Sequence, residues 1–218
     1  MTTWLTVLLA LASLAQAPPP RHVSFDTADG GHIVADLYGQ GADAVVLAHG
    51  AAFNKESWKV QAEALAARGR LVLAIDFRGY GRSTAGREDK ALYQDVLAAI
   101  RYLRAQGAAT VGVVGASMGG GASARAAVAA RAGEIDRVLL LSAVAIPDPQ
   151  DMKAGRFLFV ASRDEPLAPS VKEQFAKAPE PKRIEWIDGA GHAQNIFNTD
   201  QAARLMAVIM EFFPPVHR

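Results

Sequence analysis

The chain has 218 residues, of which 50% are hydrophobic and 21% charged, a composition typical of a single globular domain. Its formal net charge is +1 and no basic block is present, which argues against partners such as nucleic acid or an anionic membrane surface. The sequence has no cysteine, which excludes disulfides, thiolate metal sites and a cysteine nucleophile.

The first 17 residues have the pattern of a secretion signal. Their apolar run from Trp4 to Ala15 is too short to span a bilayer. Small residues at Ser13 and Ala15, and again at Ala15 and Ala17, offer two cleavage sites, of which we favour the cut after Ala15. We therefore expect an exported protein, periplasmic or secreted, with no stable membrane insertion after processing. No Lys or Arg precedes the apolar run, so an uncleaved segment on a cytoplasmic protein is the alternative.

A proline-rich spacer over residues 18–21 precedes one expected domain over residues 22–214. Alternating apolar residues from His22 to Tyr38, interrupted by Ala28-Asp-Gly-Gly31, predict a hairpin of two antiparallel strands. Further along, continuous apolar runs predict buried strands, and apolar residues at helical spacing predict helices. The expected strands cover 44–48, 71–75, 111–114, 138–144, 157–161 and 184–187, and the expected helices cover 55–68, 88–105, 118–131, 169–178 and 201–213.

The alternation of buried strands with helices predicts an α/β fold: a mostly parallel sheet with helices on both faces. Ligands of such sheets bind at the carboxyl ends of the strands. The His49-Gly50 pair, Ser117, Asp164 and His192 each come just after an expected strand. We therefore expect these residues to meet at one edge of the sheet.

The sequence around Ser117 predicts a sharp turn from a strand into a helix. Gly115-Ala-Ser117-Met-Gly119 is a G-x-S-x-G, in which a Cβ two residues before or after the serine would collide with the strand or the helix. The turn lifts the Ser117 hydroxyl clear of the sheet, near a helix N-terminus that favours an oxyanion. A phosphate-binding loop is the alternative for such a glycine-rich turn, but neither of its usual patterns is present.

With these pieces in place, the chain from His22 to Phe213 resembles the α/β-hydrolase family. The matching segments, in chain order, are His49-Gly50, Asp76-Phe-Arg-Gly-Tyr-Gly-Arg-Ser83, Gly115-Ala-Ser-Met-Gly119, Asp164 and Gly191-His192. The chain looks most similar to small lidless esterases and to dienelactone-hydrolase-like members, which often carry cysteine where this chain has serine. Relatives with a lid insert it after the strand that ends near Val144, and here about a dozen residues, 145–156, leave no room for one.

The resemblance implies a catalytic triad in the family's order of nucleophile, acid and histidine. Ser117 is the expected nucleophile, His192 the base that activates it, and Asp164 the acid that orients the histidine. Glu165, the next acidic residue, is displaced by one position from the expected place of the acid. Asp148 is the stronger rival for the acid, because some family members place it after the preceding strand.

Backbone groups are expected to supply the oxyanion hole. The N–H groups of Met118 and Ala51 are the predicted donors, with Ala52 as the second choice in the latter loop. The resemblance gives His49 a structural role in the His-Gly turn. We also expect a structural role for the segment 76–81, in which Arg78 should pair with an acid or a carbonyl.

These features predict a carboxylesterase-like serine hydrolase that acts on small-molecule esters with small or medium acyl groups in an open, wet cleft. No cofactor and no metal ion are expected, because the histidines at 22, 32, 49, 192 and 217 lack ligand spacing. A peptidase, thioesterase or acyltransferase could use the same three residues. A non-catalytic binding protein that reuses the fold is the alternative from another class.

Overall fold

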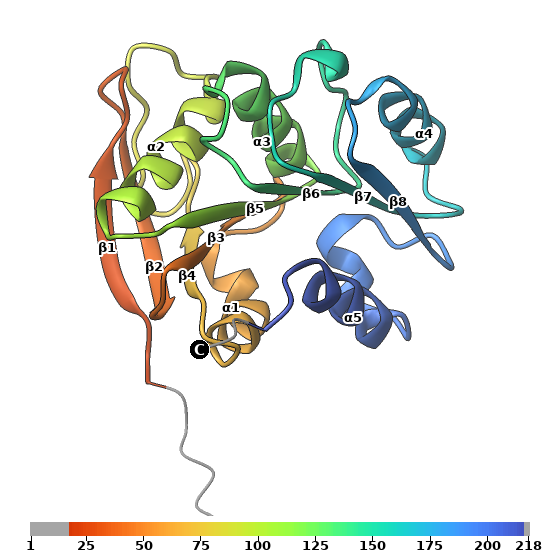
Figure 1. Cartoon of the computed structure of the whole chain (residues 1–218), viewed down its shortest axis with the longest axis horizontal. Helices are drawn as coiled ribbons and strands as arrows, with labels where there is room; N and C mark the ends of the chain where they lie inside the picture. Colours follow the sequence, from red (N-terminus) through yellow and green to blue (C-terminus); the bar gives the residue numbers. More distant parts are fainter. Residues whose placement is uncertain (1–17, 216–218) are drawn as a thin grey trace, which may run out of the picture.

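Eight strands form a single sheet at the centre of the molecule (Figure 1). The computed structural model describes residues 18–215, so the predicted signal over residues 1–17 lies outside the described residues and stays a prediction. The strands lie in the order β1-β2-β4-β3-β5-β6-β7-β8. Their bounds are β1 Arg21–Asp26, β2 His32–Gly39, β3 Asp43–Ala48, β4 Leu71–Ile75, β5 Thr110–Ala116, β6 Arg137–Leu141, β7 Phe157–Ser162 and β8 Lys182–Ile187.

The sheet is parallel except at its N-terminal edge. β1 pairs antiparallel with β2, and β2 pairs antiparallel with β4, whereas every pair from β4 to β8 is parallel. The predicted hairpin and the predicted mostly parallel α/β sheet are both confirmed. Because the parallel strands run in one direction, the loops after β3, β5, β6, β7 and β8 emerge at the same edge.

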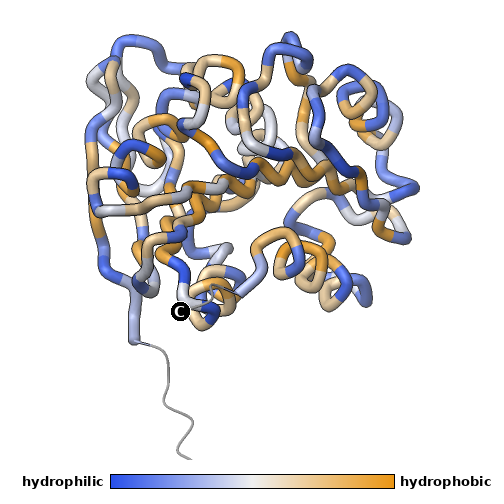
Figure 2. The backbone as a smooth tube through the Cα atoms, viewed as in Figure 1, coloured by the Kyte–Doolittle hydropathy of each residue, from blue (hydrophilic) through white to orange (hydrophobic). Residues whose placement is uncertain are grey.

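Helices cover both faces of the sheet (Figure 1). One face carries α2, α3 and α4, and its core includes Leu103, Ala124 and Val171. The other carries α1 and α5, and its core includes Leu65 and Val208. The helices are α1 Lys59–Ala66, α2 Leu92–Ala105, α3 Met118–Ala129, α4 Ala168–Lys177 and α5 Ala202–Phe212. Figure 2 shows the most hydrophobic residues along the central strands, as expected for a sheet buried on both faces.

Three short 3-10 segments, none of them predicted, lie in loops: η1 Lys55–Trp58, η2 Pro149–Asp151 and η3 Ala193–Asn198. η1 forms the first part of the predicted helix 55–68, so α1 begins at Lys59. The strand predicted over 138–144 ends at Leu141 instead, because Ser142 adopts a φ of 45° and turns the chain away from the sheet. None of the helices described combines the length and the apolar character that crossing a bilayer requires.

Arg78 is the centre of a buried ionic cluster beside the sheet. Its guanidinium donates to both Asp95 and Asp29, at 2.7 and 2.8 Å, and also to the carbonyl of Glu88. The side chains of Arg78, Asp95 and Asp29 are at most 4% exposed. The guanidinium holds the pKa of Asp29 well below its usual range. This cluster ties the loop after β4 to α2 and to the hairpin, which fits the structural role expected of residues 76–81.

Removing the cation should destabilise the fold strongly. Arg78→Met would leave two buried carboxylates without a cation, at an expected cost of about 3–5 kcal/mol in the free energy of unfolding. Because the pKa of Asp29 is lowered in the folded state, its contribution is present above the unfolded pKa and is lost as the pH falls below about 4.

Urea unfolding at neutral pH measures the Arg78→Met effect. Arg101→Ala is the matched control, because Arg101 pairs with Glu134 but is 48% exposed, and its loss should cost under about 1 kcal/mol. Equal losses in the two variants would contradict the importance of the buried cluster.

Candidate active site

Ser117 occupies a strained turn between β5 and α3. Its backbone has a φ of 49° and a ψ of −112°, a conformation that non-glycine residues rarely adopt. A Cβ at Gly115 would lie 2.4 Å from the carbonyl oxygen of Gly119, and a Cβ at Gly119 would lie 2.4 Å from that of Ala48. Both distances are shorter than any normal contact, so the turn requires glycine at these two positions, as the sequence predicts.

The hydroxyl of Ser117 lies within hydrogen-bonding distance of His192. The Oγ atom is 2.8 Å from His192 Nε2. His192 follows β8, at the start of η3, and its side chain is 36% exposed. Residues 75 positions apart in the chain therefore meet at the carboxyl edge of the sheet. Ser117 and His192 are the two predicted site residues whose side chains the structure brings together.

Glu165, rather than Asp164, lies against the other side of the His192 ring. Its Oε2 atom is 2.5 Å from His192 Nδ1, and its side chain is fully buried. Asp164 is exposed to solvent, and its backbone N–H donates to the carbonyl of Gly189. The expected contact between Asp164 and His192 is therefore wrong by one residue. The physical reason is that the turn after β7 sends these two neighbouring side chains in different directions.

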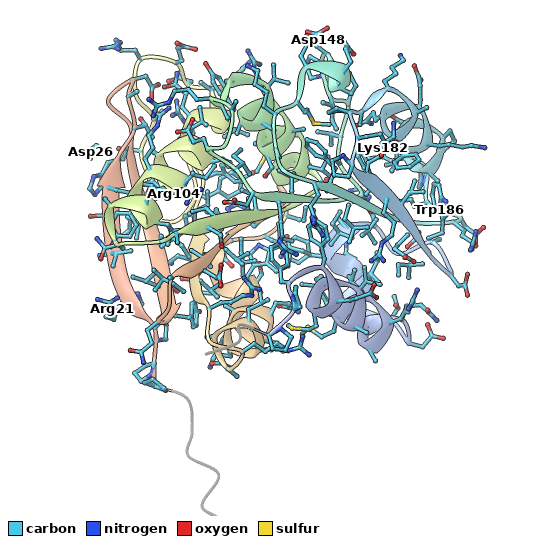
Figure 3. All side chains as sticks on the ribbon, in the orientation of Figure 1. Arg21, Asp26, Arg104, Asp148, Lys182 and Trp186 are labelled. Carbon is cyan, nitrogen blue, oxygen red and sulfur yellow. The ribbon has the colours of Figure 1, made fainter. Side chains whose placement is uncertain are left out.

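The rival acid, Asp148, is also not at the site. It is exposed, has a φ of 51°, and points outward from the loop that carries η2 (Figure 3). The first residue after β6, a position from which an acid could reach the site, is Ser142. Its hydroxyl donates to Glu165 Oε1 at 2.5 Å. Ser142 also accepts the backbone N–H of Ala193 at 3.1 Å, which connects the end of β6 to the residue after His192.

A sequence signal for Glu165 was present in the segment Ser162-Arg-Asp-Glu165. In the pattern Ser-x-x-Glu, the glutamate can turn back to the backbone N–H of the serine. Here Glu165 Oε1 accepts the N–H of Ser162 at 2.9 Å, while the Ser162 hydroxyl donates to the carbonyl of Gly191 at 2.6 Å. This local turn points the Glu165 carboxylate inward, and it holds the loop before His192 in place.

These contacts determine the tautomer of His192. An ionised carboxylate only accepts hydrogen bonds, so the short contact to Glu165 places the proton on Nδ1. Nε2 is then free to accept a proton from the Ser117 hydroxyl. The arrangement is chemically suited to activating an alcohol as a nucleophile.

The two predicted oxyanion donors are the residue after Ser117 and the residue after Gly50. Met118 is the first residue of α3, where backbone N–H groups have no partner within the helix. The His49-Gly50 loop lies beside the nucleophile, since a Cβ at Gly50 would be 3.5 Å from Ser117 Cβ. Within the described part of the chain, the N–H of Ala51 has no hydrogen-bond acceptor. The Tyr80 hydroxyl donates to the carbonyl of Ala51 at 3.1 Å.

His49 has a structural environment. It is fully buried, its Nδ1 donates to the carbonyl of Gly50 at 2.8 Å, and its Nε2 accepts the N–H of Phe77 at 3.3 Å. Burial lowers the pKa of His49, which keeps the ring neutral at neutral pH. Among residues 18–215, no group of three or more His, Asp or Glu side chains is placed to hold a metal ion.

Comparisons with known proteins agree with this architecture. Residues 45–162, more than half of the chain, match the model of the Alpha/beta hydrolase family. The AB hydrolase superfamily protein YisY of Bacillus subtilis is 29% identical over 157 residues, which cover 66% of this chain and 58% of YisY. The chain therefore spans less than two thirds of the length of that relative.

Two solved structures show the same fold. The esterase Pf2001 of Pyrococcus furiosus superposes with a TM-score of 0.74 at 17% identity, over 89% of this chain and 90% of the esterase. Dienelactone hydrolase of Anabaena variabilis superposes with a TM-score of 0.71 at 22% identity, over 90% of this chain and 98% of that enzyme. On the family match and the shared fold together, this chain belongs to the alpha/beta hydrolase family.

Proposed function

We propose that the protein is a serine hydrolase that cleaves carboxylic esters of small or medium acyl groups. The observation that carries the proposal is the continuous hydrogen-bonded chain from Ser117 Oγ through His192 to Glu165. Ser117 is the nucleophile, His192 the general base and then the general acid, and Glu165 takes the orienting role that the sequence assigned to Asp164. The esterase and dienelactone hydrolase among the structural relatives support a hydrolytic reaction.

In the proposed acylation step, His192 Nε2 takes the proton from Ser117 as Oγ attacks the carbonyl carbon of the ester. The carbonyl oxygen becomes an oxyanion, which accepts hydrogen bonds from the N–H groups of Met118 and Ala51. Each such donor contributes about 3 kcal/mol of transition-state stabilisation in hydrolases of this type. The intermediate then expels the alcohol, which receives the proton held by His192, and an acyl ester on Ser117 remains.

In the deacylation step, water attacks the acyl ester while His192 Nε2 accepts one of its protons. The second oxyanion collapses, the carboxylic acid leaves, and the proton returns from His192 to Ser117 Oγ. Throughout the cycle the Glu165 carboxylate stabilises the imidazolium and keeps the proton of the neutral ring on Nδ1. The net reaction consumes one water and one ester and yields an acid and an alcohol.

The exposure of the site, with no lid over it among the described residues, supports small or medium acyl groups as substrates. The connection 145–156, where relatives carry a lid, holds only the single 3-10 turn η2. His192 is 36% exposed, and Val144, whose N–H donates to the carbonyl of Ser117, is an exposed apolar side chain beside the nucleophile. Such a surface offers a short acyl chain some apolar contact but does not enclose a long one.

A fluorophosphonate probe should label the protein covalently at Ser117, because the probe reacts with a serine that an adjacent base activates. Ser117→Ala should abolish labelling, and Ser170→Ala, a change on α4 away from the site, should leave it intact. Intact-protein mass spectrometry measures the added mass. Labelling that persists in Ser117→Ala would refute the assignment of the nucleophile.

A matched pair of variants tests the identity of the acid. In Glu165→Gln the amide oxygen must face the donors Ser142 and Ser162, so the NH₂ group would face His192 and favour the wrong tautomer. The kcat for p-nitrophenyl acetate should fall by about 10³- to 10⁴-fold, whereas Asp164→Asn should stay within about twofold, because Asp164 is exposed. The reverse order of effects would restore Asp164 as the acid.

A series of p-nitrophenyl esters tests the substrate class. The kcat/KM values for acetate and butyrate should equal or exceed that for octanoate and should far exceed that for palmitate, because methylenes that stay in water gain no binding energy. Values that rise up to palmitate would contradict the proposed preference for small or medium acyl groups. Faster turnover of thioesters or peptides of equal acyl length would assign one of those reactions in place of ester hydrolysis.

A further inference from the structure

Gln194 connects the segment that carries His192 to the loop that carries the proposed oxyanion donor Ala51. It lies in η3, two residues after His192, and is only 4% exposed. Its Oε1 atom accepts the N–H of Gly50 at 2.8 Å, and its Nε2 atom donates to the Ser57 hydroxyl at 2.8 Å. A backbone N–H can only donate, so the contact with Gly50 fixes which end of the amide faces each loop.

The Ser57 contact anchors the same loop at its far end. The Ser57 hydroxyl donates to the carbonyl of Asn54 at 2.5 Å, and the Asn54 side chain caps η1 by accepting the N–H of Ser57. Gln194 therefore holds both ends of the segment from Gly50 to Ser57. Both of its polar groups are paired, as a buried amide requires.

The Gly50 contact also decides which amide of this loop can serve the reaction. Since the Gly50 N–H is taken by Gln194, it is withdrawn from the site, and the next N–H along the chain, that of Ala51, has no acceptor among the described residues. The close approach of Gly50 to Ser117 places this peptide beside the nucleophile. An oxyanion donor contributes fully only when it is preorganised, and misplacement by about 1 Å can cost 10²-fold in rate.

We propose that Gln194 is a positioning residue for the reaction: by fixing the peptide between His49 and Gly50, it orients the next peptide along the chain and so holds the Ala51 N–H in the oxyanion hole, aligned with His192. The inference rests on the proposed function. The base and the oxyanion donor are then held by one short segment, although Gly50 and Gln194 are 144 positions apart in the chain.

Two substitutions at Gln194 separate positioning from mere loop stability. Gln194→Leu removes both hydrogen bonds at similar volume, and Gln194→Glu keeps an acceptor for the Gly50 N–H. Gln174→Leu is the matched control, because Gln174 is also a buried glutamine, 6% exposed, and donates to Ser170 on α4 at 2.9 Å. Active sites are counted by fluorophosphonate titration, so a fraction of misfolded protein does not lower the measured rate.

With p-nitrophenyl butyrate as substrate, kcat of Gln194→Leu should fall about 10- to 100-fold, with KM within about twofold, because the lost interaction forms only in the transition state. The inhibition constant of butylboronic acid, whose tetrahedral adduct mimics the oxyanion, should rise in parallel. Gln194→Glu should recover most of kcat, and Gln174→Leu should leave kcat and KM unchanged. A kcat for Gln194→Leu within twofold of the wild type, or equal losses in both Gln194 variants, would overturn the proposal.

Hydrogen exchange of the Gly50 amide gives a readout that does not depend on activity. Exchange should be faster by at least about tenfold in Gln194→Leu than in the wild type, since the amide loses its acceptor. Unchanged protection of that amide would also overturn the inference. A wild-type protein that neither labels nor turns over esters would instead refute the proposed function and with it the catalytic part of this inference, whatever the exchange data show.

Discussion

A carboxylate held fully out of water is the constraint on which the site depends. Burying an isolated carboxylate costs several kcal/mol unless hydrogen-bond donors compensate for the lost water. Glu165 has three such donors, from the Ser142 hydroxyl, the Ser162 N–H and the His192 ring. These come from the ends of β6 and β7 and from the loop after β8. The buried charge therefore holds three loops together. It also keeps the proton of His192 on Nδ1, so that the unprotonated Nε2 faces Ser117.

The parallel sheet makes this convergence possible. β5, β6, β7 and β8 are neighbours and run in the same direction, so the segments that follow them leave at one edge. Three residues at that edge, Ser117, Ser142 and Ala193, have positive φ values although none is glycine. Such conformations persist only where the surroundings determine them strongly. The glycines at 115 and 119 provide the close packing around Ser117, and the buried bond to Glu165 fixes Ser142.

A second set of contacts supports the part of the proposed mechanism in which backbone N–H groups stabilise the oxyanion. The loop that carries the proposed oxyanion donor Ala51 follows β3, next to β5 in the sheet, and contains no charged side chain at the residues nearest Ser117. Its geometry depends on neutral hydrogen bonds, one donated by Gly50 to Gln194 and one donated by Tyr80 to Ala51, and on the buried His49 ring. The ionic cluster around Arg78 ties the loop after β4 to the hairpin and to α2. The site thus has a charged side, which orients the base, and a neutral side, which presents backbone N–H groups.

The sequence by itself determined the α/β class, the hairpin and the strand–turn–helix around Ser117, because each of these follows from a local pattern of apolar, small or polar residues. Its resemblance to the family predicted His192 as the histidine beside Ser117. Only the tertiary structure decided between Asp164 and Glu165. Adjacent side chains leave the backbone in different directions, and which one reaches His192 depends on a turn held by Ser142 and Gly191, from other strands. The contact between Gln194 and Gly50 could not be predicted from the sequence, since no local pattern encodes a pairing between residues so distant in the chain.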